Sequence, residues 1–370
     1  MPSVIDLMRI PVERRTPDHL FEMLRCAVKL EHATLPPYLT AWWSITLPKN
    51  PADPKNPSYD ILQTIVFEEM GHMGTALNLL TTVGGTPAIT DPGFVPKYPT
   101  SLPCRISPKV TPPNVRDWKI GLSRLTPAVV SDVFMIIEYP EAGPVPFRAL
   151  AEAPPPEFHT IGEFYDAIAA TLRYLVEVAQ SVRITGKKQL SEPFIGHDEQ
   201  GQNVLNPITS LDEALKAIEH IKEQGEGTPS TPDAPPFGHE LAHYYRFKQI
   251  QVGRMFQQQA DQSWALSGPF FDFPAVLPMA DIPDDGYRRP GVPQDVADKI
   301  AKFNADYKQL LALLQSAWEK GSEGGGQDDL DQAETTYMDG LSGTARELMS
   351  TPIDAANPSL GNYGPTFRVD

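Results

Sequence analysis

Two distant segments of the chain carry a glutamate and a histidine at the same spacing. One is Glu69-x-x-His72 and the other is Glu240-x-x-His243. Positions i and i+3 lie on one face of an α-helix, so each pair can direct a carboxylate and an imidazole toward one point. Two such pairs, completed by glutamates from neighbouring helices, form the di-iron or di-manganese sites of some four-helix bundles. The spacing therefore predicts a redox-active metal centre in a helical protein.

The first pair lies in a segment with clear helical periodicity, from about Ser58 to Gly84–Gly85. Ile61, Leu62, Ile65 and Ala76 lie along the same stripe as the pair, which predicts that its carboxylate and imidazole are buried. A buried carboxylate needs a compensating charge, and a metal ion is the simplest one. Glu68 is rotated by about 100° from Glu69 and should face outward or form a second layer.

Glu31 is the expected partner of the first pair. The segment from Thr16–Pro17–Asp18 to about Ser44 begins like a helix, with proline in its first turn. Glu31 lies on or beside its apolar stripe. Pro36–Pro37 removes two backbone donors one turn later and should kink the helix, as often happens beside a ligand.

The second pair allows two interpretations. In the segment from Phe237 to about Gln262, Glu240 and His243 can act as the other half of a two-metal site. His239–Glu240-x-x-His243 also matches the zinc-hydrolase spacing, with Glu240 as the base. We favour the two-metal interpretation, because the zinc alternative leaves Glu31, Glu69 and His72 buried without a role.

The remaining carboxylate ligand has three candidates. We rank Glu163 first, Glu138 second and Glu177 third. Thr160-x-x-Glu163 is also a capping box, which alone would explain Glu163. If the helices that start near Thr160 and Phe237 were antiparallel, Glu163 and Glu240 would lie at opposite ends. Glu138 or Glu177 would then be the better partner.

Composition excludes several classes of partner. The chain has 370 residues, a hydrophobic fraction of 41% and a formal net charge of −16. The charge argues against nucleic acids and anionic membranes, and no apolar run is long enough to span a bilayer. Residues 1–15 lack a signal-peptide core, and the two cysteines, Cys26 and Cys104, make a disulfide framework improbable. We expect a cytoplasmic protein with a small-molecule substrate. The sequence allows a homo-oligomer but does not determine the oligomeric state.

The 39 prolines cluster between helical segments, so we expect a mainly α fold with long, ordered, proline-rich loops. We expect no long strands. Beyond the helices that carry the candidate ligands, the periodicity predicts further helices over residues 127–138, 160–182, 211–223, 293–320 and 328–349.

Five motifs together resemble the ferritin-like iminophenyl-pyruvate dimer synthase family, which includes a domain of the bisindole-forming enzymes of violacein and rebeccamycin biosynthesis. The resemblance implies a ferritin-like four-helix bundle over residues 1–262, with inserted loops 86–126 and 185–236. Residues 263–370 would form a C-terminal helical extension packed on the bundle. The motifs are EHATLPPYL (31–39), FEEMGH (67–72), GGTP (84–87), GEFY (162–165) and ELAHYYRF (240–247).

The predicted function is metal-dependent oxidation of a small amino-acid-derived imine or related metabolite. Carboxylates with two imidazoles suit iron, with manganese as the alternative, and two ions per chain are expected. Tyr38, Tyr165 and Tyr244 are candidates for lining or redox residues. The alternatives are a ferroxidase that stores iron without an organic substrate and a helical protein that has lost its metal. The predicted ligands are Glu31, Glu69, His72, Glu163, Glu240 and His243.

Overall fold

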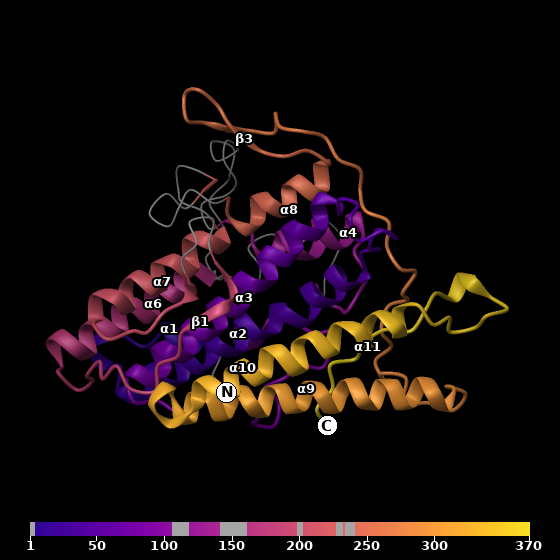
Figure 1. Cartoon of the computed structure of the whole chain (residues 1–370). Coiled ribbons are helices and arrows are strands. Elements are labelled where there is room, and N and C mark those ends of the chain that lie inside the picture. The colour runs from indigo at the N-terminus through magenta and orange to yellow at the C-terminus, as the bar shows by residue number, and fades with distance from the viewer. Residues whose placement is uncertain (1–3, 106–117, 141–160, 198–202, 227–231, 234–240) are drawn as a thin grey trace.

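Two long antiparallel helices form the middle of the molecule. The computed structural model describes residues 4–105, 118–140, 161–197, 203–226, 232–233 and 241–370. Within it, α2 (Pro17–Ser44) packs along α3 (Pro57–Thr82). The shorter helices α6, α7 and α8 lie on one side of this pair, and α9, α10 and α11 lie on the other (Figure 1).

The prediction of a mainly helical fold is confirmed, and most helices lie close to their predicted bounds. Besides α2 and α3, the helical segments are α1 (Val4–Met8), η1 (Val12–Arg14), η2 (Pro103–Arg105), α4 (Pro127–Val129), η3 (Val130–Phe134), α5 (Met135–Ile137), α6 (Ile161–Arg173), η5 (Tyr174–Val178), α7 (Leu211–Glu226), α8 (His243–Val252), α9 (Gln294–Lys320), η7 (Ser322–Gly324), α10 (Gly326–Gln332), η8 (Ala333–Met338), α11 (Asp339–Met349) and η9 (Pro358–Leu360).

Strands are short and lie outside the helical layers. β1 (Glu192–His197) pairs antiparallel with β2 (Asn203–Leu205), and β3 (Gln257–Gln258) pairs antiparallel with β4 (Trp264–Ala265). None of the helices in the described part of the chain is long and apolar enough to cross a membrane.

Local sequence explains how α2 begins and how it continues past its double proline. The Thr16 hydroxyl accepts a hydrogen bond from the His19 amide, and the His19 ring accepts one from the Thr16 amide, so both donors at the helix start are satisfied. Pro37 has no amide hydrogen to donate to the carbonyl of Ala33. The Tyr98 hydroxyl donates to that carbonyl instead, at 2.8 Å. The prolines therefore do not end the helix.

Two predictions from the sequence are wrong, one about the cysteines and one about the helix that contains His243. Cys26 and Cys104 form a disulfide, with their Cα atoms 6.3 Å apart, because the segment around η2 packs against α2. Because 78 residues separate them in the sequence, spacing alone did not predict that they are close.

The helix predicted from Phe237 to about Gln262 is much shorter in the described residues. Leu241 forms an isolated bridge with Asp233, Ala242 is the N-cap, and α8 begins at His243.

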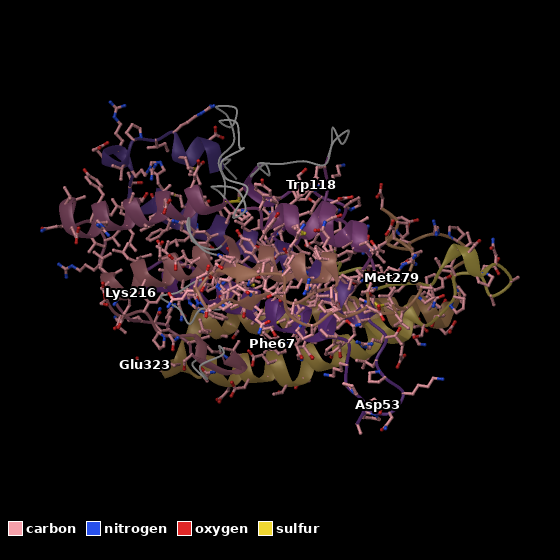
Figure 2. The ribbon with its side chains drawn as sticks, turned by 90° about the horizontal axis from the view of Figure 1, so that it is seen from above. Asp53, Phe67, Trp118, Lys216, Met279 and Glu323 are labelled. Atoms are coloured by element: carbon pink, nitrogen blue, oxygen red, sulfur yellow. A yellow bond between two sulfur atoms is a disulfide. The ribbon has the colours of Figure 1, made fainter. Side chains whose placement is uncertain are left out.

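The core continues from the central helices into the C-terminal segment. Phe367 is buried, and its ring stacks on Trp43 of α2 with centroids 6.0 Å apart. Its edge meets Phe303 and Tyr307 of α9 at centroid distances of 4.9 and 5.1 Å. Phe67 of α3 likewise lies near the middle of the molecule, whereas Asp53, in the connection between α2 and α3, lies at the periphery (Figure 2). The division into a bundle and an extension stays a prediction, but residues of both share one core.

Replacing Phe367 with alanine should therefore destabilise the whole protein. We expect Phe367→Ala to lower the free energy of unfolding by about 3–5 kcal/mol, the usual cost of removing a buried aromatic ring. Chemical denaturation followed by circular dichroism measures the change. The control is Phe270→Ala, because Phe270 is 75% exposed and loses only a surface contact with Arg254, which should cost about 1 kcal/mol or less. Equal effects of the two substitutions would contradict a shared core.

Candidate metal centre

The two long central helices bring three of the predicted residues together. Glu31 comes from α2, and Glu69 and His72 come from α3. All three are buried, and one ligand atom of each lies within 4.8 Å of the others. Nδ1 of His72 is 3.7 Å from a carboxylate oxygen of Glu31 and 3.8 Å from Oε1 of Glu69. The i, i+3 spacing on α3 therefore directs both side chains toward one point.

A second group shares Glu69 with the first. Nδ1 of His243 is 2.8 Å from Oε1 of Glu69 and 3.7 Å from Oε2 of Glu138. The ring centroids of His72 and His243 are 5.5 Å apart. Glu69 thus lies between two clusters of oxygen and nitrogen atoms, each with its own histidine and one further glutamate.

Four helical elements supply these five residues. His243 is the first residue of α8. Glu138 directly follows the short helix α5, which itself directly follows the π-helical turn η3. A π-helical turn inserts an extra residue and is frequent at functional sites. Here it precedes the point at which the chain delivers a glutamate to the cluster.

Each glutamate of the cluster receives a hydrogen bond from a hydroxyl group. The Tyr38 hydroxyl donates to Oε1 of Glu138 at 2.6 Å, and the Tyr165 hydroxyl donates to Oε1 of Glu31. Thr34 donates to Oε2 of Glu69 at 3.0 Å. These bonds occupy one oxygen of each carboxylate, so they orient the other oxygen toward the histidines. Tyr38 and Tyr165 therefore do line the cluster.

The third candidate tyrosine has a different environment. Tyr244 packs edge-on against Tyr139 and Tyr245, with ring centroids 5.7 and 5.1 Å away. This aromatic packing accounts for its burial.

The histidines point their second nitrogens at different partners. Nε2 of His72 is 2.7 Å from the side-chain oxygen of Gln224 in α7. Nε2 of His243 is 2.8 Å from Oε2 of Glu68, whose other oxygen accepts a hydrogen bond from Arg246 at 2.9 Å. Such outer partners fix the ring orientation and tautomer of a metal-binding histidine. Glu68 therefore lies in the second layer, one of its two predicted locations.

Burial and mutual repulsion disfavour the charged forms of the carboxylates. Burial and then the neighbouring Glu69 raise the pKa of Glu31 well above its ordinary value. Burial and then Glu138 raise the pKa of Glu69. Burial also acts on Glu68, but Arg246 and His243 outweigh it and lower the pKa of that carboxyl to about 2. The cluster is thus short of positive charge around Glu31, Glu69 and Glu138.

The two imidazoles respond in opposite directions. Burial and the nearby His243 lower the pKa of His72 to about 3, so its ring is neutral. Burial acts in the same direction on His243, but the adjacent carboxylates of Glu138, Glu68 and Glu69 raise the pKa of that ring well above its ordinary value. Nδ1 of His243 nevertheless makes no well-aligned hydrogen bond. The oxygen-rich donor set and this nitrogen fit a hard or borderline metal ion.

Four of the six predicted ligands lie in the cluster. Glu31, Glu69, His72 and His243 lie together, with Glu138 as the third carboxylate. Glu163 belongs to neither group, because α6 directs Tyr165, two positions later, at Glu31. Glu177 is exposed in η5. Among the three candidates for this carboxylate, the structure therefore places the second-ranked one, Glu138, in the cluster.

Glu240 lies outside the described residues. Among its neighbours that the structure describes, Leu241 is bridged to Asp233 and α8 begins at His243, so the role of Glu240 stays a prediction. His239, which the zinc alternative required, also lies outside the described residues. The signal for Glu138 was an apolar run, Met135–Ile137, that ends in a single acid before Tyr139–Pro140.

A cavity of about 30 Å³ adjoins the cluster. The glutamates and His72 line one side of it, and Ile137, Ile161, Ile221 and Lys222 line much of the rest. Lys222 makes an ion pair with Asp166 at 2.6 Å, and its side chain is 17% exposed. The cavity therefore combines apolar walls with one cation.

Comparisons with other proteins agree with the helical fold. A family model described as ferritin-like matches residues 24–252. The crystal structure of a ferritin-like protein from Caulobacter vibrioides has a TM-score of 0.59 and 22% sequence identity, and the match covers 96% of this chain and 99% of that one. At this identity the likeness shows the fold alone. No curated protein sequence matches the chain significantly.

The Glu68–Arg246 pair should be essential for the stability of the centre. We expect Glu68→Gln to lower the free energy of unfolding by about 3–5 kcal/mol, because it leaves a buried arginine without its carboxylate. Thermal and urea unfolding of the metal-free protein measure the loss. Glu177→Gln is the control, since this exposed glutamate should contribute less than about 0.5 kcal/mol. Full stability of Glu68→Gln would show that the pair contributes little.

Proposed function

The chain belongs to the ferritin-like family, and we propose that its buried carboxylate–histidine cluster binds two iron ions and uses dioxygen to oxidise a small organic molecule. The position of Glu69 carries the proposal. Its Oε1 lies 3.8 Å from Nδ1 of His72 and 2.8 Å from Nδ1 of His243, so one carboxylate can serve two metal positions. Manganese suits the same donor atoms and is the alternative metal.

The chain's own groups would hold the metals and control their surroundings. Glu31, Glu69 and His72 would hold one ion, and Glu69, Glu138 and His243 would hold the other, with Glu240 retained as a predicted further ligand. When bound, the two iron ions would supply the redox chemistry by which electrons taken from the substrate reduce dioxygen. Tyr38, Tyr165 and Thr34 would keep the carboxylates oriented through their hydrogen bonds. Gln224 and Glu68 would keep Nδ1 of each histidine directed inward.

The substrate class rests on the motifs and on the cavity. The resemblance to the iminophenyl-pyruvate dimer synthase family supports a small amino-acid-derived imine or a related metabolite. The apolar residues that line the cavity beside the cluster are compatible with a small organic molecule. We propose a small molecule as the partner of this site, and the strongly acidic chain disfavours nucleic acids.

One observation favours a second function. The cavity beside the cluster measures only about 30 Å³, which is far below the ~300–1,000 Å³ of ordinary ligand pockets. A ferroxidase that oxidises and stores iron needs no room for an organic substrate. Oxygen consumption by the iron-loaded protein, with and without keto-acid and imine candidates, separates the two functions. Substrate-dependent consumption supports the oxidase, whereas consumption that only accompanies growth of a mineral core supports storage.

Metal stoichiometry should identify the third carboxylate. We expect the wild-type protein to bind two ferrous ions per chain under anaerobic conditions and Glu138→Gln to bind the second at least tenfold more weakly, because one of its oxygen ligands is lost. Glu163→Gln should retain both ions at wild-type affinity and is the matched control. Anaerobic titration with metal analysis gives both numbers. Loss of an ion in Glu163→Gln but not in Glu138→Gln would contradict the role of Glu138 and support Glu163, the first-ranked candidate from the sequence, as the third carboxylate.

Metal binding should also stabilise the fold. Ferrous or manganous ions at about 100 times their dissociation constant should raise the free energy of unfolding by about 2.7 kcal/mol per site. They also relieve the repulsion among Glu31, Glu69 and Glu138. Differential scanning calorimetry with and without metal measures the increase. Glu69→Ala should lose most of it, and an unchanged increase in that variant would remove Glu69 from the centre.

A further inference from the structure

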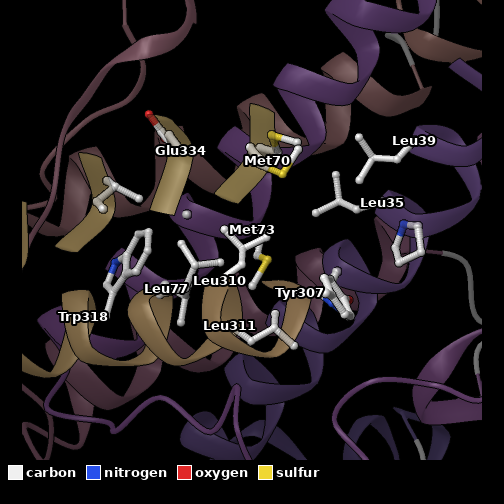
Figure 3. Close-up of a pocket in the computed structure, with 16 residues that line it drawn as sticks. Leu35, Leu39, Met70, Met73, Leu77, Tyr307, Leu310, Leu311, Trp318 and Glu334 are labelled. Atoms are coloured by element: carbon white, nitrogen blue, oxygen red, sulfur yellow. The ribbon is translucent and has the colours of Figure 1, made fainter. Parts of the chain in front are cut away.

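A second cavity lies on a different face of the same two helices. It has a volume of about 70 Å³ and lies between α2 and α3 on one side and α9, α10 and η8 on the other (Figure 3). Its α2 and α3 walls include His32, Leu35, Met70 and Met73, each one position after a residue of the metal centre. One position turns a helix by about 100°, so the cavity and the metal centre are separate sites.

The cavity depends on the C-terminal segment. Half of its lining residues, from Tyr307 to Met338, lie beyond the ferritin-like match, which ends at residue 252. Part of this wall is the π-helical turn η8, which contributes Glu334 and Met338. π-helical turns are frequent at functional sites. The bundle alone would therefore not enclose this space.

The walls suit an apolar ring better than water. Leucine and methionine side chains from both sides converge on the space, and Trp318 closes one end (Figure 3). A water molecule needs only about 10–15 Å³ but also two to four polar partners, whereas an engineered apolar cavity of about 150 Å³ stays dry and accepts benzene. A ring that enters the smaller space here must therefore displace the flexible methionine side chains. Methionine side chains adapt their shape and make favourable contacts with aromatic rings. Met70, Met73 and Met338 provide three such contacts.

One polar atom of a residue that lines the cavity has no partner in the described part of the chain. His32 is 2% exposed, and its Nε2 is 2.6 Å from the hydroxyl of Tyr307, which also lines the cavity. Its Nδ1 makes no hydrogen bond to any described residue. A buried nitrogen without a partner destabilises the fold, because it has lost its hydrogen bonds to water. A ligand with one hydrogen-bonding group would relieve that cost.

We propose that this cavity is a binding site for a small aromatic molecule with one hydrogen-bonding group. The ring would lie between Met70 and Met73, and the polar group would bond to Nδ1 of His32. The site is distinct from the metal centre and does not depend on the function proposed for that centre.

Phenol and toluene test both parts of the proposal, because they are similar in size and differ in one hydroxyl group. Isothermal titration should show saturable binding of both, with phenol about five- to tenfold tighter, as expected for one hydrogen bond. His32→Phe should reduce the affinity for phenol to that for toluene and leave the latter within about twofold. Equal binding of both ligands by the wild type would contradict the role of His32.

Leu314→Trp tests the location, because it fills the cavity and should abolish binding of both ligands. Leu360→Trp is the matched control, since Leu360 is 47% exposed and does not line the cavity. Diffraction from phenol-soaked wild-type crystals locates the ligand independently of any variant. Phenolates coordinate iron, so the titrations are repeated after metal removal and should give the same affinities. No saturable binding, or density only at the metal centre, would overturn the proposal.

Discussion

Burial of three carboxylates around one point is the constraint on which the rest of the structure depends. Glu31, Glu69 and Glu138 lie among helices that exclude water, and their mutual repulsion adds to the cost of burial. Such a group is stable only when positive charge and hydrogen-bond donors compensate it. Three hydroxyl groups, the His243 ring and the proposed metal ions provide that compensation. The cluster itself is thus the strongest argument for a cation.

The metal cluster, the apolar cavity and the contact with the C-terminal segment all lie on the α2–α3 pair. One face carries the ligands, and the next carries the apolar cavity beneath the C-terminal helices. Ring packing of Phe367 on Trp43 joins the C-terminal segment to the same pair. Small changes in the spacing of α2 and α3 would therefore affect the centre, the cavity and the core together.

Sequence periodicity predicted the features that depend on residues close together in the sequence. The bounds of α2, α3, α7 and α9 followed from caps, prolines and apolar stripes, and the Glu69–His72 pair followed from its spacing on a buried face. Contacts between distant segments could not be predicted in this way. Glu138 and Glu163 each looked acceptable. Only the packing of distant segments separates them, because it places Glu138 beside Glu69 and His243 and directs Tyr165 of α6 at Glu31. The Cys26–Cys104 disulfide and the start of α8 at His243 also depend on the path of proline-rich segments, for which periodicity carries no signal.

Anomalous diffraction from crystals grown with ferrous or manganous ions tests the central claim most directly. The account predicts two anomalous peaks, one on each side of the Glu69 carboxylate, with Nδ1 of His72 beside one and Nδ1 of His243 beside the other. A cluster without peaks, or peaks that lie away from Glu69, would contradict it.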